Sequence, residues 1–152
     1  METEVRQSRE PEPVIQFSIF ADNKVGRLNE LMQRLAQRDL HVMAVTQLDS
    51  TECTIIRLIA DYPEDARQAL GEHGYAFTES AVIVAEMHTE ADLKFITAAL
   101  VEAEINIHYL YSFVSRPNGR SAMVLNVEDN DLAESVLKAH QIRCLTRGDI
   151  AR

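Results

Sequence analysis

Apolar residues recur along the chain with two spacings, which predict short strands and amphipathic helices in a repeating order. Residues 14–20 suit a strand, whereas residues 27–38 place apolar side chains three and four apart, as on one face of a helix. Two strands follow at 40–48 and 53–60, and then a helix from Pro63 to a cap at Gly74. The second half repeats this order, with strands predicted at 82–87, 105–115, 121–127 and 142–145 and helices around Ile96 and at 131–140.

The two halves align with each other over long stretches, which indicates a duplication. A shift of 65 residues pairs Leu28 with Leu93, and a shift of 67 pairs Leu70 with Leu137. The two extra residues fall near the turn signal at 116–119, where a hairpin tip tolerates an insertion.

Each unit has the order βαββαβ, which is the ferredoxin-like plan. The predicted fold class is therefore α+β: two ferredoxin-like repeats packed together, each an antiparallel sheet with its helices on one face. We expect a disordered tail at 1–13, a first repeat at 14–79 and a second repeat at 80–152. No linker separates the units, and residues 77–87 can form one strand shared by both, so we expect one rigid body.

The predicted strand at 53–60 is apolar on both faces, with Ile55 and Ile59 on the face opposite Ile56 and Leu58. A sheet that faces water on one side would alternate apolar with polar residues. The second face must therefore be covered, either by the other repeat or by a second subunit, and we predict a homodimer. Arg57 interrupts the apolar row, and we interpret it as a snorkelling or interface-paired arginine rather than a catalytic one.

Composition excludes several classes of function. Lys and Arg number 15 against 24 Asp and Glu, a net charge of −9, which argues against nucleic-acid binding. No apolar run is long enough to cross a membrane, so we expect a soluble, cytoplasmic protein. Cys53 and Cys144 are too few for a disulfide framework or a zinc site, and we expect buried free thiols.

The segment between the first strand and the first helix carries the best candidate site. Glycine directly before a helix permits a tight turn and close approach of a ligand to the backbone. The unpaired N–H groups of the first turn, together with the helix dipole, then favour a carboxylate. Asn23 can cap the helix or bind an α-amino-acid zwitterion, and two cations lie nearby. The segment reads Asn23-Lys24-Val25-Gly26-Arg27-Leu28.

This segment resembles the ligand loop of ACT domains, small ferredoxin-like modules that bind amino acids and regulate metabolism. In that family an Asp or Asn is followed by Pro-Gly and, one residue on, by Leu. Asn23, Gly26 and Leu28 match this pattern, whereas Val25 stands where proline is usual.

A second match lies in the other repeat, where Asn106 and Ile107 resemble the start of the family's second strand. In family members this asparagine comes from a neighbouring domain and contacts the ligand at the other domain's loop. The body of the chain, about residues 14–150, thus resembles tandem ACT-domain proteins with no attached enzyme. The resemblance implies a non-catalytic regulatory module that binds a small amino acid between ACT-like domains. The implied site comprises Asn23, Lys24, Val25, Gly26, Arg27 and Leu28 with Asn106 and Ile107, without a cofactor or metal.

The partners implied by the resemblance are a small amino acid, a second copy of the chain and an enzyme regulated in trans. Whether the composite site forms within one chain or between subunits stays open. The reciprocal pocket departs from the family pattern: His41 replaces the asparagine, and the second loop, 88–93, has no glycine. In that loop Thr89 and Asp92 have the spacing of a capping box, so we expect no anion there.

Two other classes of function remain as alternatives. One is a small metal-dependent or hydrolytic enzyme, for which His41, His88 and His108 are the candidate ligands, although no ligand-pair spacing or nucleophile motif is present. The other is an assembly module that has lost its ligand. Asn23, Gly26 and Asn106 argue for binding, because a scaffold does not need all three.

Overall fold

A computed structural model describes residues 12–151 of the chain, and it has the predicted α+β architecture. The predicted tail at 1–13 lies almost wholly outside the described residues. The helical and extended elements are, in chain order, β1 (Val14–Ala21), α1 (Arg27–Gln37), β2 (Val42–Asp49), β3 (Thr54–Ala60), α2 (Pro63–Glu72), β4 (Ala76–Met87), α3 (Ala91–Glu102), β5 (Ile107–Ser112), the 3₁₀ turn η1 (Pro117–Gly119), β6 (Ser121–Val127), α4 (Asn130–Ala139) and α5 (Arg147–Ile150).

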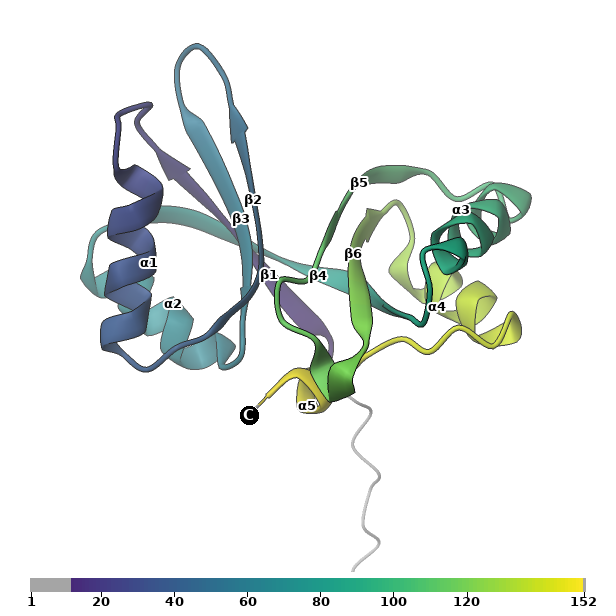
Figure 1. The fold of residues 1–152 in the computed structure, drawn as a ribbon. Coiled ribbons are helices and arrows are strands. Elements are labelled where there is room, and N and C mark those ends of the chain that lie inside the picture. Colours follow the sequence, from purple (N-terminus) through teal and green to yellow (C-terminus); the bar gives the residue numbers. More distant parts are fainter. Residues whose placement is uncertain (1–11, 152) are drawn as a thin grey trace, which may run out of the picture.

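The strands form one antiparallel sheet in the order β2-β3-β1-β4-β6-β5 (Figure 1). Strand β4 joins the two repeats, because its first half pairs with β1 and its second half pairs with β6. The predicted boundary between residues 79 and 80 falls inside this 12-residue strand. The two ferredoxin-like sheets are therefore continuous through one backbone.

The last predicted strand, 142–145, is the main correction to the predicted elements. The described chain makes only an isolated bridge there, between Cys144 and Ala85. Two hydrogen bonds, from Glu86 N–H to the Arg143 carbonyl and from Leu145 N–H to the Val84 carbonyl, hold it beside β4. The chain then turns into α5, whose first residues form a capping box at Thr146, so the strand cannot extend.

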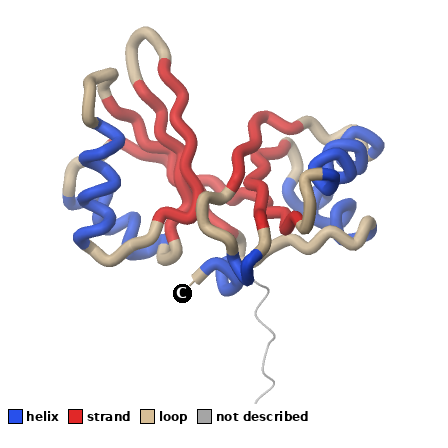
Figure 2. Tube along the Cα trace, in the orientation of Figure 1, coloured by secondary structure: helices blue, strands red, loops and turns tan. Residues whose placement is uncertain are grey.

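The four long helices lie on the outer faces of the sheet, α1 and α2 on one half and α3 and α4 on the other (Figure 2). Each helix pair covers its own apolar core. The first core contains Phe17, Leu31 and Leu58, and the second contains Ile96, Leu125 and Leu137.

A third core lies between the helix-free faces of the two halves. It brings together Val14, Ile59 and Val84 with Tyr111 and Phe113, all of which are buried. Near this core the outermost strands meet: Ala44 bridges to Phe113, and Val114 N–H donates to the Met43 carbonyl. The sheet therefore bends until its two edges touch.

The third core explains why β3 carries apolar residues on both faces. Ile59 is 1% exposed, and the other repeat covers it. Ile55, nearer the tip of the β2–β3 hairpin, is only partly buried. The predicted homodimer is thus not needed to bury Ile59, and it stays a prediction.

The duplication is also visible in the backbone conformation. Asp39 and Glu104, related by the shift of 65, have φ of 56° and 57°, and Gly74 and Gln141, related by the shift of 67, have φ of 72° and 63°. Each of these residues follows a helix as a left-handed C-terminal cap. The irregular register in β2 between Val42 and Ala44 recurs in β5 between Ile107 and Tyr109.

Truncation of Ile59 to alanine tests whether the third core makes the repeats one cooperative unit. We expect the variant to lose about 2–5 kcal/mol of unfolding free energy, because it leaves a cavity between the repeats. The matched control is Val101→Ala on the outer face of α3, which we expect to change stability by less than about 0.5 kcal/mol. Chemical denaturation followed by circular dichroism measures both, and two separate transitions in the wild-type protein would contradict a single unit.

Candidate ligand site

The loop between β1 and α1 gives the first helix an open N-terminus. Gly26 is the N-cap residue, with φ 90° and ψ 0°, a left-handed conformation that side chains rarely adopt. A Cβ built on Gly26 would have nothing within 4 Å, so the space above the loop is empty. Glycine is therefore required here by the backbone conformation and leaves room for another molecule.

No side chain caps this helix, contrary to the expectation that Asn23 could do so. The turn at Val25 and Gly26 places three residues between Asn23 and the first helical turn, where the Asn23 side chain makes no hydrogen bond with a described residue. The first-turn N–H groups, from Arg27 to Asn29, cannot be satisfied within the helix, and no described loop group accepts from them. Donors and a polar amide are thus left free on one exposed loop.

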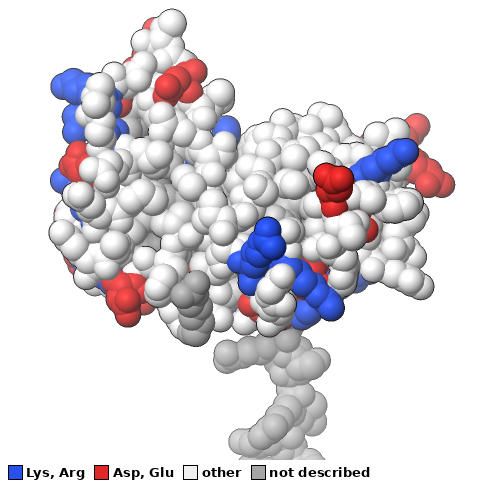
Figure 3. Space-filling model, in the orientation of Figure 1, with Lys and Arg blue, Asp and Glu red and all other residues white. Residues whose placement is uncertain are grey.

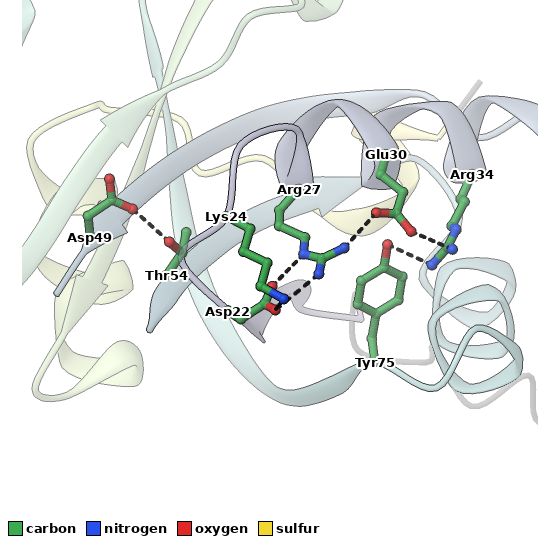
Figure 4. A network of polar contacts seen from close by, with 8 residues as sticks. All are labelled: Asp22, Lys24, Arg27, Glu30, Arg34, Asp49, Thr54 and Tyr75. Carbon is green, nitrogen blue, oxygen red and sulfur yellow. Dashed lines mark hydrogen bonds and ion pairs between the residues drawn. The ribbon is translucent and has the colours of Figure 1, made fainter. Parts of the chain in front are cut away.

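The two cations of the loop are held by neighbouring carboxylates (Figure 4). Arg27 donates to both oxygens of Asp22 and, from its Nη1, to Glu30 Oε2 at 3.1 Å. Lys24 Nζ lies 3.5 Å from Asp22 Oδ2. The hydrogen bonds from Arg27 lower the pKa of Asp22, so this carboxylate stays ionised at neutral pH.

The ion-pair network extends along α1 and links this helix to Tyr75, which directly precedes β4. Glu30 Oε1 lies 2.5 Å from an Arg34 nitrogen, and Arg34 also donates to the Tyr75 hydroxyl at 3.1 Å. Leu28 packs against the first core, whereas Val25 is fully exposed. The loop is therefore anchored at its helical end and presents an apolar side chain to solvent at its tip.

The structure does not bring Asn106 and Ile107 to this loop within one chain. Both residues lie where α3 gives way to β5; Asn106 is exposed, and Ile107 packs against the second core. In Figure 1 the β1–α1 connection and the α3–β5 connection stand on opposite sides of the molecule. A pocket that combines the two groups of residues therefore needs a second chain.

In the second repeat, the carboxylate of Asp92 folds back onto the loop that precedes the equivalent helix. Asp92 Oδ2 accepts hydrogen bonds from His88 N–H at 2.7 Å and from Thr89 N–H at 3.1 Å, and these bonds lower the pKa of Asp92. The Thr89 hydroxyl makes no reciprocal bond, so only half of the predicted capping box forms. The N–H groups of Asp92 and Leu93, in the first turn of α3, donate instead to the carbonyls of Thr89 and Glu90, so this end is more fully satisfied than that of α1.

The histidines are dispersed over the described part of the chain. His41 binds Asp61, with Nδ1 2.9 Å from Oδ2, whereas His88 lies beside Glu86. No three His, Cys, Asp or Glu side chains among residues 12–151 are grouped so that they could hold a metal ion. In the same part of the chain, no helix combines the length and apolarity that a membrane span requires.

A groove of about 570 Å³ lies between the start of β1, the middle of β4, α4 and the segment 144–146. It lies where a regular last strand would have continued along β4. Cys144 lines it, and burial raises the pKa of that thiol to about 11. Apolar residues of β1 and β4 and polar residues of α4 line the rest of it, and on α4 Glu134 and Lys138 pair with each other at 2.9 Å.

Two buried polar groups had no signal in the sequence. Glu86 is 4% exposed and pairs with Arg120, whose Nη1 lies 2.8 Å from Oε1. Gln16 is fully buried between the two halves, where it binds two tyrosine hydroxyls. Both residues alternate with apolar residues along their strands. The alternation of polar and apolar residues would therefore place both side chains on a face exposed to solvent.

Comparison with known proteins identifies the family. The family profile for an ACT domain pair matches residues 13–152. The chain belongs to the ACT domain family. This ACT domain pair is also similar to a protein of Bacteroides thetaiotaomicron, with 26% identity, 93% of this chain and 98% of that chain covered, and a TM-score of 0.82.

Regulatory subunits of aspartate kinase share the fold. The ligand-free subunit of Thermus thermophilus is 16% identical, with 85% and 91% of the two chains covered and a TM-score of 0.59. The subunit of Thermus flavus is 17% identical, with 87% and 93% covered and a TM-score of 0.58. No match was found among curated proteins.

The raised pKa of Cys144 predicts a slow thiol. At pH 8 only about 0.1% of a thiol with a pKa near 11 is ionised, and the thiolate is the reactive form. We therefore expect Cys53→Ser to react slowly with a disulfide reagent and to speed up about tenfold per pH unit between 8 and 10. Unfolding in guanidinium should restore the rate of a free cysteine; a native rate that already equals it would contradict the burial.

Proposed function

We propose that this ACT domain pair is a non-catalytic regulatory module that binds a small amino acid between ACT domains of two chains. The open N-terminus of α1 is the observation that carries the proposal. Gly26 leaves space above the helix, and the N–H groups of the first turn have no partner among the described residues. A ligand carboxylate at this position would accept those donors and meet the favourable end of the helix dipole.

The neighbouring side chains suit the rest of an α-amino acid. Asn23 offers a donor and an acceptor that no described residue uses. Asp22, ionised and exposed, lies close enough to the loop to attract an ammonium group. The exposed side chain of Val25 would form an apolar wall for the ligand or for the chain that covers it.

A second chain completes the site in this proposal. Asn106 of that chain takes the place that the family assigns to the asparagine of a neighbouring domain. This follows from the separation of the two groups of residues within one chain (Figure 1). The module would then be at least a dimer, with the amino acid bound where two chains meet, and it would act on an enzyme in trans by changing that assembly.

The first experiment locates the ligand. A thermal-shift screen against the twenty amino acids identifies it, because a ligand at 100 times its Kd stabilises the folded protein by about 2.7 kcal/mol. Calorimetry on variants then tests the site. We expect Gly26→Asp to abolish binding, and Asn23→Ala or Asn106→Ala to weaken it about ten- to a hundredfold.

The control for Gly26→Asp is Ala91→Asp, at the equivalent position of the second repeat. Because loop carbonyls already accept from the first-turn N–H groups of Asp92 and Leu93 there, and the carboxylate of Asp92 repels an anion, we expect affinity within about twofold of wild type. Equal losses at both positions would mean two working sites. Unchanged binding in Gly26→Asp would move the pocket away from α1.

Mixing two defective chains tests whether the site forms between subunits. In a dimer of one Gly26→Asp chain and one Asn106→Ala chain, one site carries both changes and the other carries neither. Refolding an equimolar mixture should therefore restore wild-type affinity in about a quarter of the sites, because half of the randomly formed dimers are mixed. Failure of the mixture to regain any tight site would place the pocket within one chain.

A further inference from the structure

The helix-free face of the first repeat carries one charged side chain, Arg57. It points away from α1 and α2, in a row that crosses the sheet through Ser18 on β1 and Thr46 on β2, its partners in register. The next row toward the third core contains Ala44 and Ile59, which are buried. Arg57 thus lies at the point where the space between the two halves begins to open.

No carboxylate of residues 12–151 pairs with this guanidinium, although the chain has nine more acidic than basic residues. Arg57 makes no ion pair with a described residue. The next strand, β4, presents Thr78 beside Ser18, and Glu79 points to the other face, where it binds Arg67. The buried Glu86 lies beyond the third core and is paired with Arg120.

The contacts that Arg57 does make leave its hydrogen-bonding edge unused. Its guanidinium carbon lies 4.0 Å from the centre of the Tyr109 ring, so one flat face stacks on the facing half of the sheet. Its Nε is buried, with no acceptor among the described residues. Stacking satisfies the plane of a guanidinium, whereas its five N–H donors point outward along the edge and need oxygen atoms.

The wall opposite Arg57 is held rigidly. Tyr109 and Tyr111 on β5 stack at 6.4 Å, and the fully buried Gln16 bonds to both hydroxyls at 2.6 Å. Burial raises the pKa of Tyr111 above its ordinary value, so its hydroxyl remains a donor to Gln16. The aromatic surface on which Arg57 stacks is therefore fixed in place before any ligand binds.

Apolar side chains surround the outer part of the same space. Phe20, Ile55 and Leu48 form the next row across β1, β3 and β2, and Phe20 and Leu48 are 41% and 55% exposed. The surface is notched between the two halves at the end where the β2–β3 hairpin projects (Figure 3). The space is closed at its inner end, because Ala44 bridges to Phe113 there.

We propose that this notch, between the β2–β3 hairpin and β5, binds a small monocarboxylate with an apolar body. The carboxylate accepts two parallel hydrogen bonds from Nη1 and Nη2 of Arg57, which, unlike Nε, are not buried, and the apolar body lies on Phe20, Ile55 and Leu48. Charge complementarity selects an anion, since Arg57 is the one charge on these rows. This site is separate from the α1 loop and stands whether or not the proposed amino-acid site does.

The same charges select against amino acids. An α-ammonium group brought beside Arg57 would meet a like charge and no carboxylate, so its desolvation would go uncompensated. A carboxylic acid without an amino group binds without that penalty. The notch thus distinguishes an acid from the corresponding amino acid, the opposite of what the α1 loop would select.

Phenylacetate is the probe for the test, with phenylacetamide as the neutral control and phenylalanine as the zwitterionic one. NMR of ¹⁵N-labelled full-length protein follows the Arg57 Nε–Hε signal, identified by its loss in Arg57→Met. We expect phenylacetate to shift this signal saturably with a Kd of about 10 mM or tighter. Phenylacetamide and phenylalanine should each bind at least about tenfold more weakly.

Three variants complete the experiment. Arg57→Met should weaken phenylacetate binding at least about tenfold, and Arg57→Lys should fall between it and wild type because it retains the charge but not the fork. Arg116→Met, which removes an exposed arginine near η1, and Gly26→Asp, in the α1 loop, should leave phenylacetate affinity unchanged. Circular dichroism establishes that each variant is folded.

The proposal is wrong if phenylacetate causes no saturable shift, if phenylacetamide binds equally well, or if Arg57→Met binds as tightly as wild type. Loss of phenylacetate binding in the Gly26→Asp variant would also overturn the proposal, because it would place the phenylacetate site at the α1 loop. Loss of amino-acid binding in Gly26→Asp with phenylacetate binding retained would support two independent sites.

Discussion

The burial of two sheet faces against each other is the constraint on which this molecule depends. A ferredoxin-like unit covers only one face of its sheet with helices, and the strands of both repeats carry apolar residues on the other face as well. The third core solves this within one chain by bending the sheet until β2 and β5 touch. Because this core lies at one end of the facing strands, their remaining length is left partly open.

The bend also determines where each repeat presents its loops. With the helices on the outside, the N-terminus of α1 and the entry to β5 are turned away from each other. The two groups of residues that the proposed site combines are thus separated in the single chain. If the proposed site uses both groups, ligand binding would depend on association of two chains.

Most of the fold could be predicted from the sequence because it depends on local periodicity. The helices, the shared strand and the turn at 116–119 follow from the spacing of apolar residues and from a few turn residues. Because the chain is duplicated, each element predicted in one repeat is supported by its equivalent in the other. The last strand failed because Ile142 to Leu145 has strand-like composition, whereas Thr146 and Asp149 begin a helix too soon for a ladder to form.

The candidate site was less predictable than the fold. Gly26 could be recognised from its place before a helix, but the absence of an Asn23 cap depends on the three residues, 24–26, that separate Asn23 from the first helical residue. The burial of Ile59 under the other repeat and the stacking of Arg57 on Tyr109 both join residues about 50 positions apart in the chain. Spacing rules describe only residues that are close in sequence, so they could not predict either contact. Gln16 looked solvent-facing for the same reason, since its two tyrosine partners come from the other repeat.

Strand β4 has a consequence for how such a protein can evolve. Side chains along a strand alternate between its two faces. Phe77 packs against the first core and Ile83 against the second, and because an even number of positions separates them, both side chains lie on the same face of β4. This spacing decides on which side of the sheet each helix pair lies. Insertion of a single residue between them would turn the second repeat over and move its helices to the opposite face. The junction of the duplicated units is therefore closed to insertions of an odd number of residues, whereas the turn before β6, which lies in a loop, carries the two additional residues of the second repeat.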